Sequence, residues 1–170
     1  MKYSAFIDMS NVRLDGDILD IGFKNYGIIY SVYKYHKDNC EVEYFCSDEA
    51  ESNMKKNSYD CCCLFFTVSK LKSCNKRKKI LNHIYDSLKC DGIIYIWDMD
   101  KQIMKTCHSK IKVRLPDFKI KNFAVKDINI FKDCSMKKSM ELINNDFKII
   151  ESKSWDGIYY IKAKKIIKSS

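Results

Sequence analysis

The pattern of apolar and polar positions along the chain predicts strands that alternate with helices. Residues 17–22 form a short apolar run that ends at a glycine, and residues 26–36 follow it with apolar side chains at helical spacing. Residues 41–46 predict a further strand. Residues 59–68 and 93–97 are almost continuously apolar, which is typical of central strands that are covered on both faces.

Two helices and a closing hairpin complete the pattern. A helix is predicted from Asn75, a plausible N-cap, to Lys89, with Gly92 just past its end. Ser135 is the predicted cap of a second helix. The last strands, residues 147–152 and 158–163, flank Trp155-Asp156-Gly157, which reads as a hairpin loop. Residues 111–115 alternate between apolar and basic side chains, as an exposed strand does.

This order of elements predicts an α/β fold with a mostly parallel sheet and an antiparallel C-terminal hairpin. The chain has 170 residues, of which 46% are hydrophobic, and this is enough to bury one core. Only five glycines and one proline occur, so no linker divides the chain. We expect residues 1–170 to form a single domain.

The formal net charge of +9 indicates an anionic partner in the first instance. The basic residues are nearly all lysines spread along the chain, whereas bidentate recognition of phosphates and bases favours arginine, which occurs only at positions 13, 77 and 114. Nucleic acid is therefore not the expected partner. The basic stretch over residues 99–132 suits an anionic small molecule, or is simply solvated lysine.

The nine cysteines give no spacing typical of a metal site, because none forms a Cys-x-x-Cys pair and Cys107-His108 has no second pair to complete a tetrahedral set. Cys61, Cys62 and Cys63 lie in an apolar run and are expected to be buried thiols. Reduced thiols, the lack of an export signal and the lack of a membrane-spanning run predict a cytoplasmic protein that binds no metal and no membrane.

Several segments, in order, resemble the class I S-adenosylmethionine-dependent methyltransferases. Residues 16–22 resemble the first strand and the start of the Gly-rich cofactor loop, and residues 42–51 are similar to the segment whose acidic residues lie beside the adenine. Residues 57–67 look like the fourth strand, which begins with an aromatic-Asp pair. Residues 80–98 resemble the following helix, its Leu-Lys-x-x-Gly turn and the fifth strand.

The resemblance implies a Rossmann-like fold that binds S-adenosylmethionine at the carboxyl ends of its strands, where the strand order reverses. Transferred residue by residue, it predicts these cofactor-binding residues: Asp20, Gly22, Phe23, Asp48, Glu49, Phe65 and Phe66.

The chain departs from the family pattern in two places. Gly22 is kept, but Lys24 and Tyr26 stand where the next two glycines usually lie, and Gly27 comes one residue late. The chain between the first strand and Asp48 is also short. Either one strand-helix unit is missing before the acidic segment, which we prefer, or residues 41–46 serve as the second strand and Asp48 is the ribose acid.

The function that the resemblance implies is methyl transfer from S-adenosylmethionine to an unidentified small molecule. The alternative is a non-catalytic binding or scaffolding protein of the same fold, which the altered loop favours. No catalytic residue can be named, because Leu64-Phe65-Phe66-Thr67 replaces the Asn/Asp-Pro-Pro-aromatic signature of amino-group methyltransferases. Methyl transfer can depend mainly on proximity and orientation, so this absence does not exclude activity.

Overall fold

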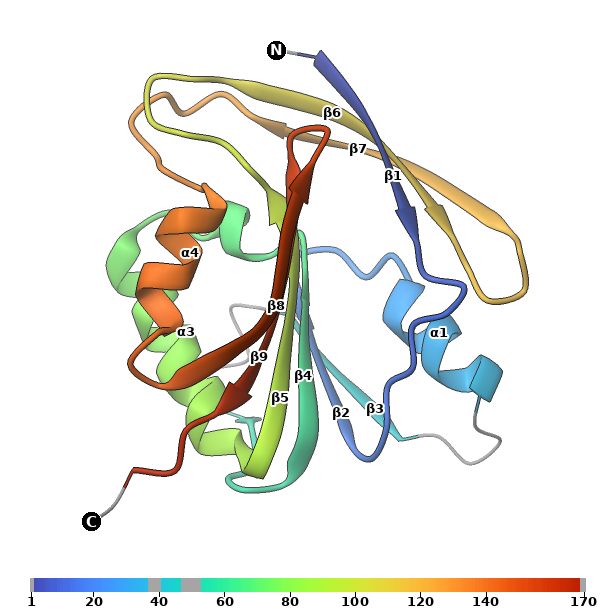
Figure 1. Ribbon diagram of the computed structural model, residues 1–170, viewed down its shortest axis with the longest axis vertical. Coiled ribbons are helices and arrows are strands. Elements are labelled where there is room, and N and C mark those ends of the chain that lie inside the picture. Colours follow the sequence, from blue (N-terminus) through green and yellow to red (C-terminus); the bar gives the residue numbers. More distant parts are fainter. Residues whose placement is uncertain (1, 37–40, 47–52, 169–170) are drawn as a thin grey trace.

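A six-stranded sheet forms the centre of the protein (Figure 1). The computed structural model describes residues 2–36, 41–46 and 53–168. The strand order is β3-β2-β4-β5-β9-β8, in which the first four strands are parallel and the last two form an antiparallel hairpin at the edge. The bounds are β2 (Ile18–Gly22), β3 (Val42–Cys46), β4 (Tyr59–Phe65), β5 (Leu88–Met99), β8 (Phe147–Trp155) and β9 (Ile158–Lys165). The predicted Rossmann-like fold class is confirmed.

Helices cover both faces of this sheet (Figure 1). Helix α1 (Ile28–His36) lies on one face and buries Ile28, Ile29 and Val32 against it. Helices α3 (Cys74–Ser87) and α4 (Met136–Ile143) lie on the other face. None of the helices in the described parts of the chain has the length and apolar character that crossing a bilayer requires.

Helix α3 begins and ends differently from the prediction. Its N-cap is Ser73, whose hydroxyl accepts a hydrogen bond from the Lys76 amide at 3.2 Å, so the prediction of Asn75 is wrong by two residues. Gly92 does not follow the helix end, because the chain becomes extended at Leu88 and continues directly as β5. A Cβ at Gly92 would lie 2.8 Å from the Leu88 Cβ, so the glycine permits a close approach within the strand.

Strand β4 is shorter than its apolar run. It ends at Phe65 because Phe66 has a left-handed φ of 53°, and the apolar residues that follow enter a short 3₁₀ helix, η1 (Val68–Lys70). The cap of α4 and the hairpin are confirmed. The Ser135 hydroxyl accepts from the Lys138 amide, and the turn between β8 and β9 has two left-handed residues, Asp156 and Gly157, as a two-residue hairpin of matching twist requires.

Strand β3 pairs directly with β2, in parallel register, and helix α1 connects the two. This βαβ arrangement places residues 42–46 at the position of the second strand. The alternative interpretation of the sequence is therefore correct for this strand, and the preferred interpretation, in which a strand-helix unit is missing before the acidic segment, is wrong. Among the described residues no strand lies beyond β3 at this edge of the sheet.

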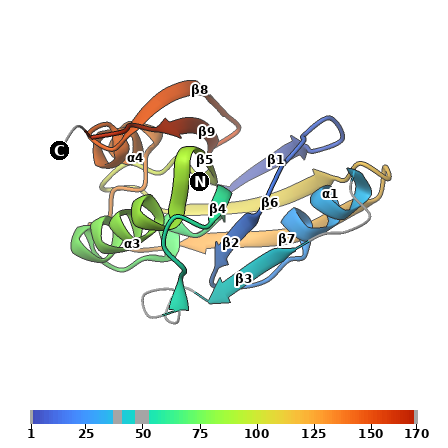
Figure 2. The ribbon, with the colours of Figure 1, turned by 90° about the horizontal axis from the view of Figure 1, so that it is seen from below.

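A second, three-stranded sheet was not predicted. It has the order β1-β6-β7, with β1 (Lys2–Asp8) parallel to β6 (Cys107–Arg114) and β7 (Ile120–Asp127) antiparallel to β6. The alternating segment is thus a strand, as expected, but its apolar face is buried: Ile111 and Val113 are fully covered. Together, Figures 1 and 2 place this sheet on the same side of the main sheet as α1.

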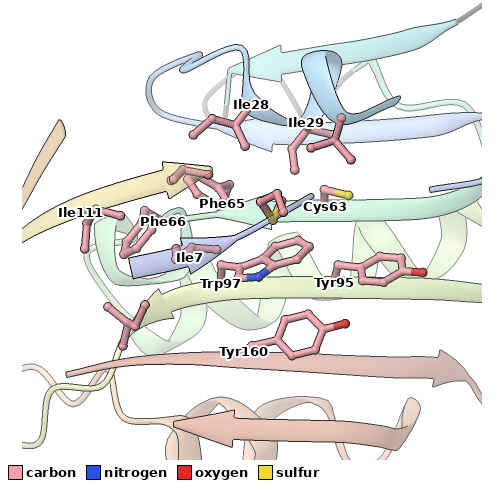
Figure 3. Close-up of a cluster of buried hydrophobic side chains, with 14 of the residues drawn as sticks. Ile7, Ile28, Ile29, Cys63, Phe65, Phe66, Tyr95, Trp97, Ile111 and Tyr160 are labelled. Atoms are coloured by element: carbon pink, nitrogen blue, oxygen red, sulfur yellow. The ribbon is translucent and has the colours of Figure 1, made fainter. Parts of the chain in front are cut away.

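The main sheet therefore separates two hydrophobic cores. One core lies under α3 and α4. The other joins α1, the main sheet and the second sheet, and it is rich in aromatic side chains (Figure 3). Because the second sheet contributes Ile7, Ile111 and Val125 to this core, its position over the main sheet is fixed by hydrophobic burial.

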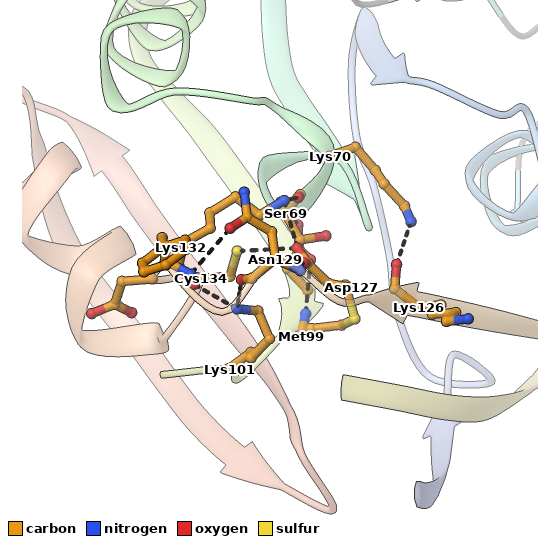
Figure 4. Close-up of polar contacts among 12 residues, drawn as sticks. Ser69, Lys70, Met99, Lys101, Lys126, Asp127, Asn129, Lys132 and Cys134 are labelled. Carbon is orange, nitrogen blue, oxygen red and sulfur yellow. Dashed lines mark hydrogen bonds and ion pairs between the residues drawn. The ribbon is translucent and has the colours of Figure 1, made fainter. Parts of the chain in front are cut away.

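A buried lysine attaches the end of β7 to the main sheet. The Lys101 side chain is 2% exposed, and its ammonium donates to the backbone carbonyls of Asn129 at 2.8 Å, Lys105 at 3.3 Å and Lys132 (Figure 4). Lys132 in turn forms an ion pair with the buried Asp127 carboxylate. A buried charge is tolerated only where such partners satisfy it. The Lys101 ammonium therefore orders the loops on both sides of the second sheet.

We predict that Lys101→Met lowers the free energy of unfolding by about 3 kcal/mol, because the carbonyls of Lys105, Asn129 and Lys132 lose their shared donor. The measurement is urea unfolding at neutral pH. Lys112→Met on the exposed face of β6 is the matched control and should cost less than about 0.5 kcal/mol. Equal losses for the two variants would contradict a structural role for the Lys101 ammonium.

Candidate cofactor site

The candidate site lies at the carboxyl end of β2, where the chain leaves the sheet. Asp20, Gly22 and Phe65 line one small pocket together with Lys24, Tyr26 and the start of α1. Asp20 and Gly22 come from β2 and Phe65 from the end of the neighbouring parallel strand β4, so the parallel register brings them to one sheet edge.

Tyr26 occupies the side of this pocket that faces the second sheet. Its ring stacks on Phe123 of β7, with 4.2 Å between ring centroids and 25° between ring planes, and it meets Phe65 edge-on at 6.4 Å. The Lys121 ammonium, also on β7, donates to the Tyr26 carbonyl at 2.9 Å. The loop after β2 is thus held from outside by a strand that lies far away in the sequence.

The space that remains beside the loop is small. The pocket volume is about 10 Å³, which is room for about one water molecule. Tyr44 of β3 also covers the backbone of the loop, because its hydroxyl donates to the Gly22 carbonyl at 3.1 Å. A ligand cannot approach the glycine backbone from this side without moving these aromatic side chains.

The end of β4 is ordered by two further contacts. The Phe66 amide donates to the Trp97 carbonyl at 2.7 Å, and the buried Thr67 hydroxyl donates to the Ile21 carbonyl at the same distance. Phe66 is held in its left-handed conformation and packs edge-on against Phe65 and Phe123. The aromatic residues at this strand end therefore form part of the core.

Among the residues that the structure describes, Asp20 is the one carboxylate that lines this pocket. It is 7% exposed, and no hydrogen-bond partner for its carboxylate occurs among the residues that the structure describes. Burial raises its pKa to about 7, because the surrounding side chains replace water around the charged form. The protonated form of Asp20 is therefore favoured over a wider pH range than that of an exposed aspartate.

The structure thus brings together part of the predicted site. Asp20, Gly22 and Phe65 share the pocket, and Phe66 packs behind it. Phe23 is 40% exposed and does not line the pocket. Asp48 and Glu49 lie outside the described residues.

Sequence reasoning missed Phe123 and Lys121, which close the site. Their region was expected to suit an anionic small molecule or to be solvated lysine, and nothing in the local pattern distinguishes Phe123 from other exposed-strand residues. The only signal was indirect: Tyr26 in place of a glycine requires an apolar partner somewhere in the fold.

Comparisons with known proteins agree with this architecture. No family model matches the sequence, and neither does any curated protein. Among solved structures, a Burkholderia thailandensis 1,6-didemethyltoxoflavin-N1-methyltransferase, which contains 1,6-didemethyltoxoflavin and S-adenosylhomocysteine, superposes with a TM-score of 0.58. The match has 12% identity and covers 88% of this chain and 70% of that one. A Methanosarcina mazei S-adenosylmethionine-dependent methyltransferase gives 0.54 at 13% identity, over 89% of this chain and 93% of its own.

The chain has the class I S-adenosylmethionine-dependent methyltransferase fold. A third similar structure, the [4+2]-cyclase SpnF, has a TM-score of 0.59 at 11% identity and covers 89% of this chain and 76% of its own. Because the name of that neighbour is not that of a methyltransferase, the methyltransferase fold alone does not decide the reaction.

The described residues leave little open space at the altered loop. Tyr26 and Phe65 line the pocket beside Gly22, and its volume is about 10 Å³. Asp20 still favours a ligand, since a buried carboxylate without a partner in the described structure is suited to a cationic or hydrogen-bonding group of a ligand.

We predict that Asp20 makes the protein less stable as the pH rises. In the unfolded chain the carboxyl ionises near pH 3.8, and in the folded protein near pH 7, so between these values the unfolded state loses its proton first and is favoured. Between pH 5 and pH 8 the free energy of unfolding should fall by about 2–3 kcal/mol more in the wild type than in Asp20→Asn. Denaturant unfolding at both pH values measures the difference, and parallel pH dependence of the two proteins would contradict it.

Proposed function

We propose that this chain is a binding protein built on the methyltransferase fold and that it does not transfer methyl groups in its native form. The observation that supports this proposal is the position of Tyr26, which packs between Phe65 and Phe123 and leaves about 10 Å³ beside the loop.

The contacts that Tyr26 would lose indicate how strongly this residue opposes cofactor binding. Moving the ring away breaks one stacked and one edge-on aromatic contact, and moving the loop also breaks the Lys121 hydrogen bond. Together these interactions contribute on the order of 3 kcal/mol. This amount lowers a ligand affinity about a hundredfold, so a micromolar cofactor would bind at about 0.1 mM.

The second candidate is an S-adenosylmethionine-dependent methyltransferase that acts on a small molecule, and an anionic acceptor would suit the basic surroundings. Two features favour the methyltransferase. Asp20 is buried without a hydrogen-bond partner among the described residues, and the first glycine of the cofactor loop is present as Gly22. Here Asp20 would hold the charged or hydrogen-bonding end of the cofactor, which supplies the methyl group.

Calorimetry with S-adenosylhomocysteine separates the two candidates. We expect no binding to the wild type at micromolar ligand. In the Lys24→Gly/Tyr26→Gly variant, removal of the ring should allow binding with about micromolar affinity, about −8 kcal/mol. Urea unfolding must accompany the titration, because each added glycine costs up to about 1 kcal/mol of stability.

Gly22→Val is the control for the site of binding, since its side chain would contact the Tyr44 hydroxyl and the Lys24 carbonyl. Micromolar binding to the wild type that Gly22→Val abolishes, in a protein that still folds, would overturn the non-catalytic proposal in favour of the methyltransferase.

A further inference from the structure

A second open space has a lining separate from that of the pocket at the altered loop. It is a cleft of about 590 Å³ between β1, with the loop that follows it, and the face of β5, β8 and β9. Pockets that bind small molecules typically have volumes of about 300–1,000 Å³. This cleft and the pocket beside Tyr26 have no lining residue in common, so the inference below does not rest on the proposed function.

Three aromatic side chains form the floor of the cleft. Tyr95 and Trp97 stack at 5.9 Å with 8° between their planes, and Tyr160 lies beside Trp97 at 5.0 Å. Figure 3 shows that the hydroxyls of Tyr95 and Tyr160 point in the same direction. Each tyrosine is only 8% exposed, yet neither hydroxyl has a hydrogen-bond partner in the described part of the chain.

These two hydroxyls act as hydrogen-bond donors. Burial, the main cause, raises the pKa of both tyrosines above the ordinary value of 10. Both side chains therefore stay protonated at physiological pH. Tyr95 and Tyr160 line the open cleft, and their hydroxyls have no partner among the described residues, so they can donate to a ligand that carries acceptor atoms.

The charged residues of the cleft also favour an anion. Its two carboxylates are already paired, Asp8 with Arg114 and Glu151 with Lys153. Arg13 and Lys162 line the same cleft, and neither forms an ion pair with any described carboxylate. Two cations thus remain available to a phosphate or carboxylate group.

Two further aromatic side chains, Phe6 of β1 and Trp155 of β8, line the cleft. Phe6 is 44% exposed, and the Trp155 indole donates to the Phe6 main-chain carbonyl at 2.9 Å, which links β8 to β1. Arg114 lies over the Phe6 ring, and Lys153 lies over the Trp155 ring. A planar ligand would therefore have to stack on the other face of each ring. Aromatic side chains bind nucleobases by stacking on their faces, and nearby cations bind the phosphates.

We propose that this cleft binds a nucleotide, with its base against Phe6 and Trp155 and its phosphate at Arg13 and Lys162. The hydroxyls of Tyr95 and Tyr160 donate to the ligand's acceptor atoms. The nucleotide comes either free or as one unit of a single-stranded RNA.

Intrinsic fluorescence reports directly on this proposal, because both tryptophans of the protein, Trp97 and Trp155, line the cleft. The wild type is titrated with the four ribonucleoside monophosphates, their nucleosides, inorganic phosphate and a short single-stranded RNA, with calorimetry for stoichiometry. A saturable fluorescence change with at least one monophosphate, at one site per chain, is expected.

Variants test the assigned residues. Arg13→Gln/Lys162→Gln should weaken monophosphate binding at least tenfold, while nucleoside binding stays unchanged. Tyr160→Phe keeps the ring and should weaken both ligands severalfold. The matched control removes two charges from the exposed side of α3, as Lys76→Gln/Lys78→Gln, and should bind like the wild type.

The titration with single-stranded RNA distinguishes a free nucleotide from one unit of an RNA strand. Binding of the RNA more than about tenfold tighter than the monophosphate, with competition between them, assigns a strand, and equal affinities assign a free nucleotide. No saturable change at millimolar monophosphate overturns the proposal. Inorganic phosphate that binds as tightly as the nucleotides, or monophosphate binding that the Arg13/Lys162 variant retains, overturns it as well.

Discussion

The contact between Tyr26 and Phe123 is the interaction on which the rest of the functional architecture depends. It joins the loop after β2 to the last strand of the second sheet, and Lys121 reinforces it through the Tyr26 carbonyl. Because the second sheet lies over the α1 side of the main sheet, this contact closes the strand edge where the fold usually binds its cofactor. An open cleft of about 590 Å³ lies on the face of β5, β8 and β9.

The second sheet holds this position through buried polar groups as well as apolar contacts. The Lys101 ammonium binds three loop carbonyls at the ends of β6 and β7, and the buried Asp98 carboxylate accepts from the amide of Ser69 beside them. Such a hydrogen-bonded network specifies one arrangement of loops, whereas apolar burial alone permits several. The placement of Phe123 over Tyr26 follows from both kinds of interaction.

The same fold supports different uses of its sites. The similar structures include two methyltransferases and a [4+2]-cyclase, which are 11–13% identical to this chain. At this identity they establish the arrangement of strands and helices but not the chemistry. In this chain the residues that favour cofactor binding differ from the residue that opposes it. Asp20 and Gly22 retain features of a cofactor loop, and Tyr26 opposes them from two residues before α1.

The sequence by itself determined the main sheet, because its evidence is local. Continuous apolar runs identified β4 and β5, helical spacing identified α1 and α3, and Trp155-Asp156-Gly157 identified the closing hairpin. The sequence also shows Lys24 and Tyr26 in place of two loop glycines, a change that bears on cofactor binding. Only the tertiary structure decided where β3 pairs, that β1 joins a strand more than a hundred residues away, and that Phe123 covers Tyr26. These contacts depend on which distant surfaces bury each other, and local periodicity carries no information about such pairings.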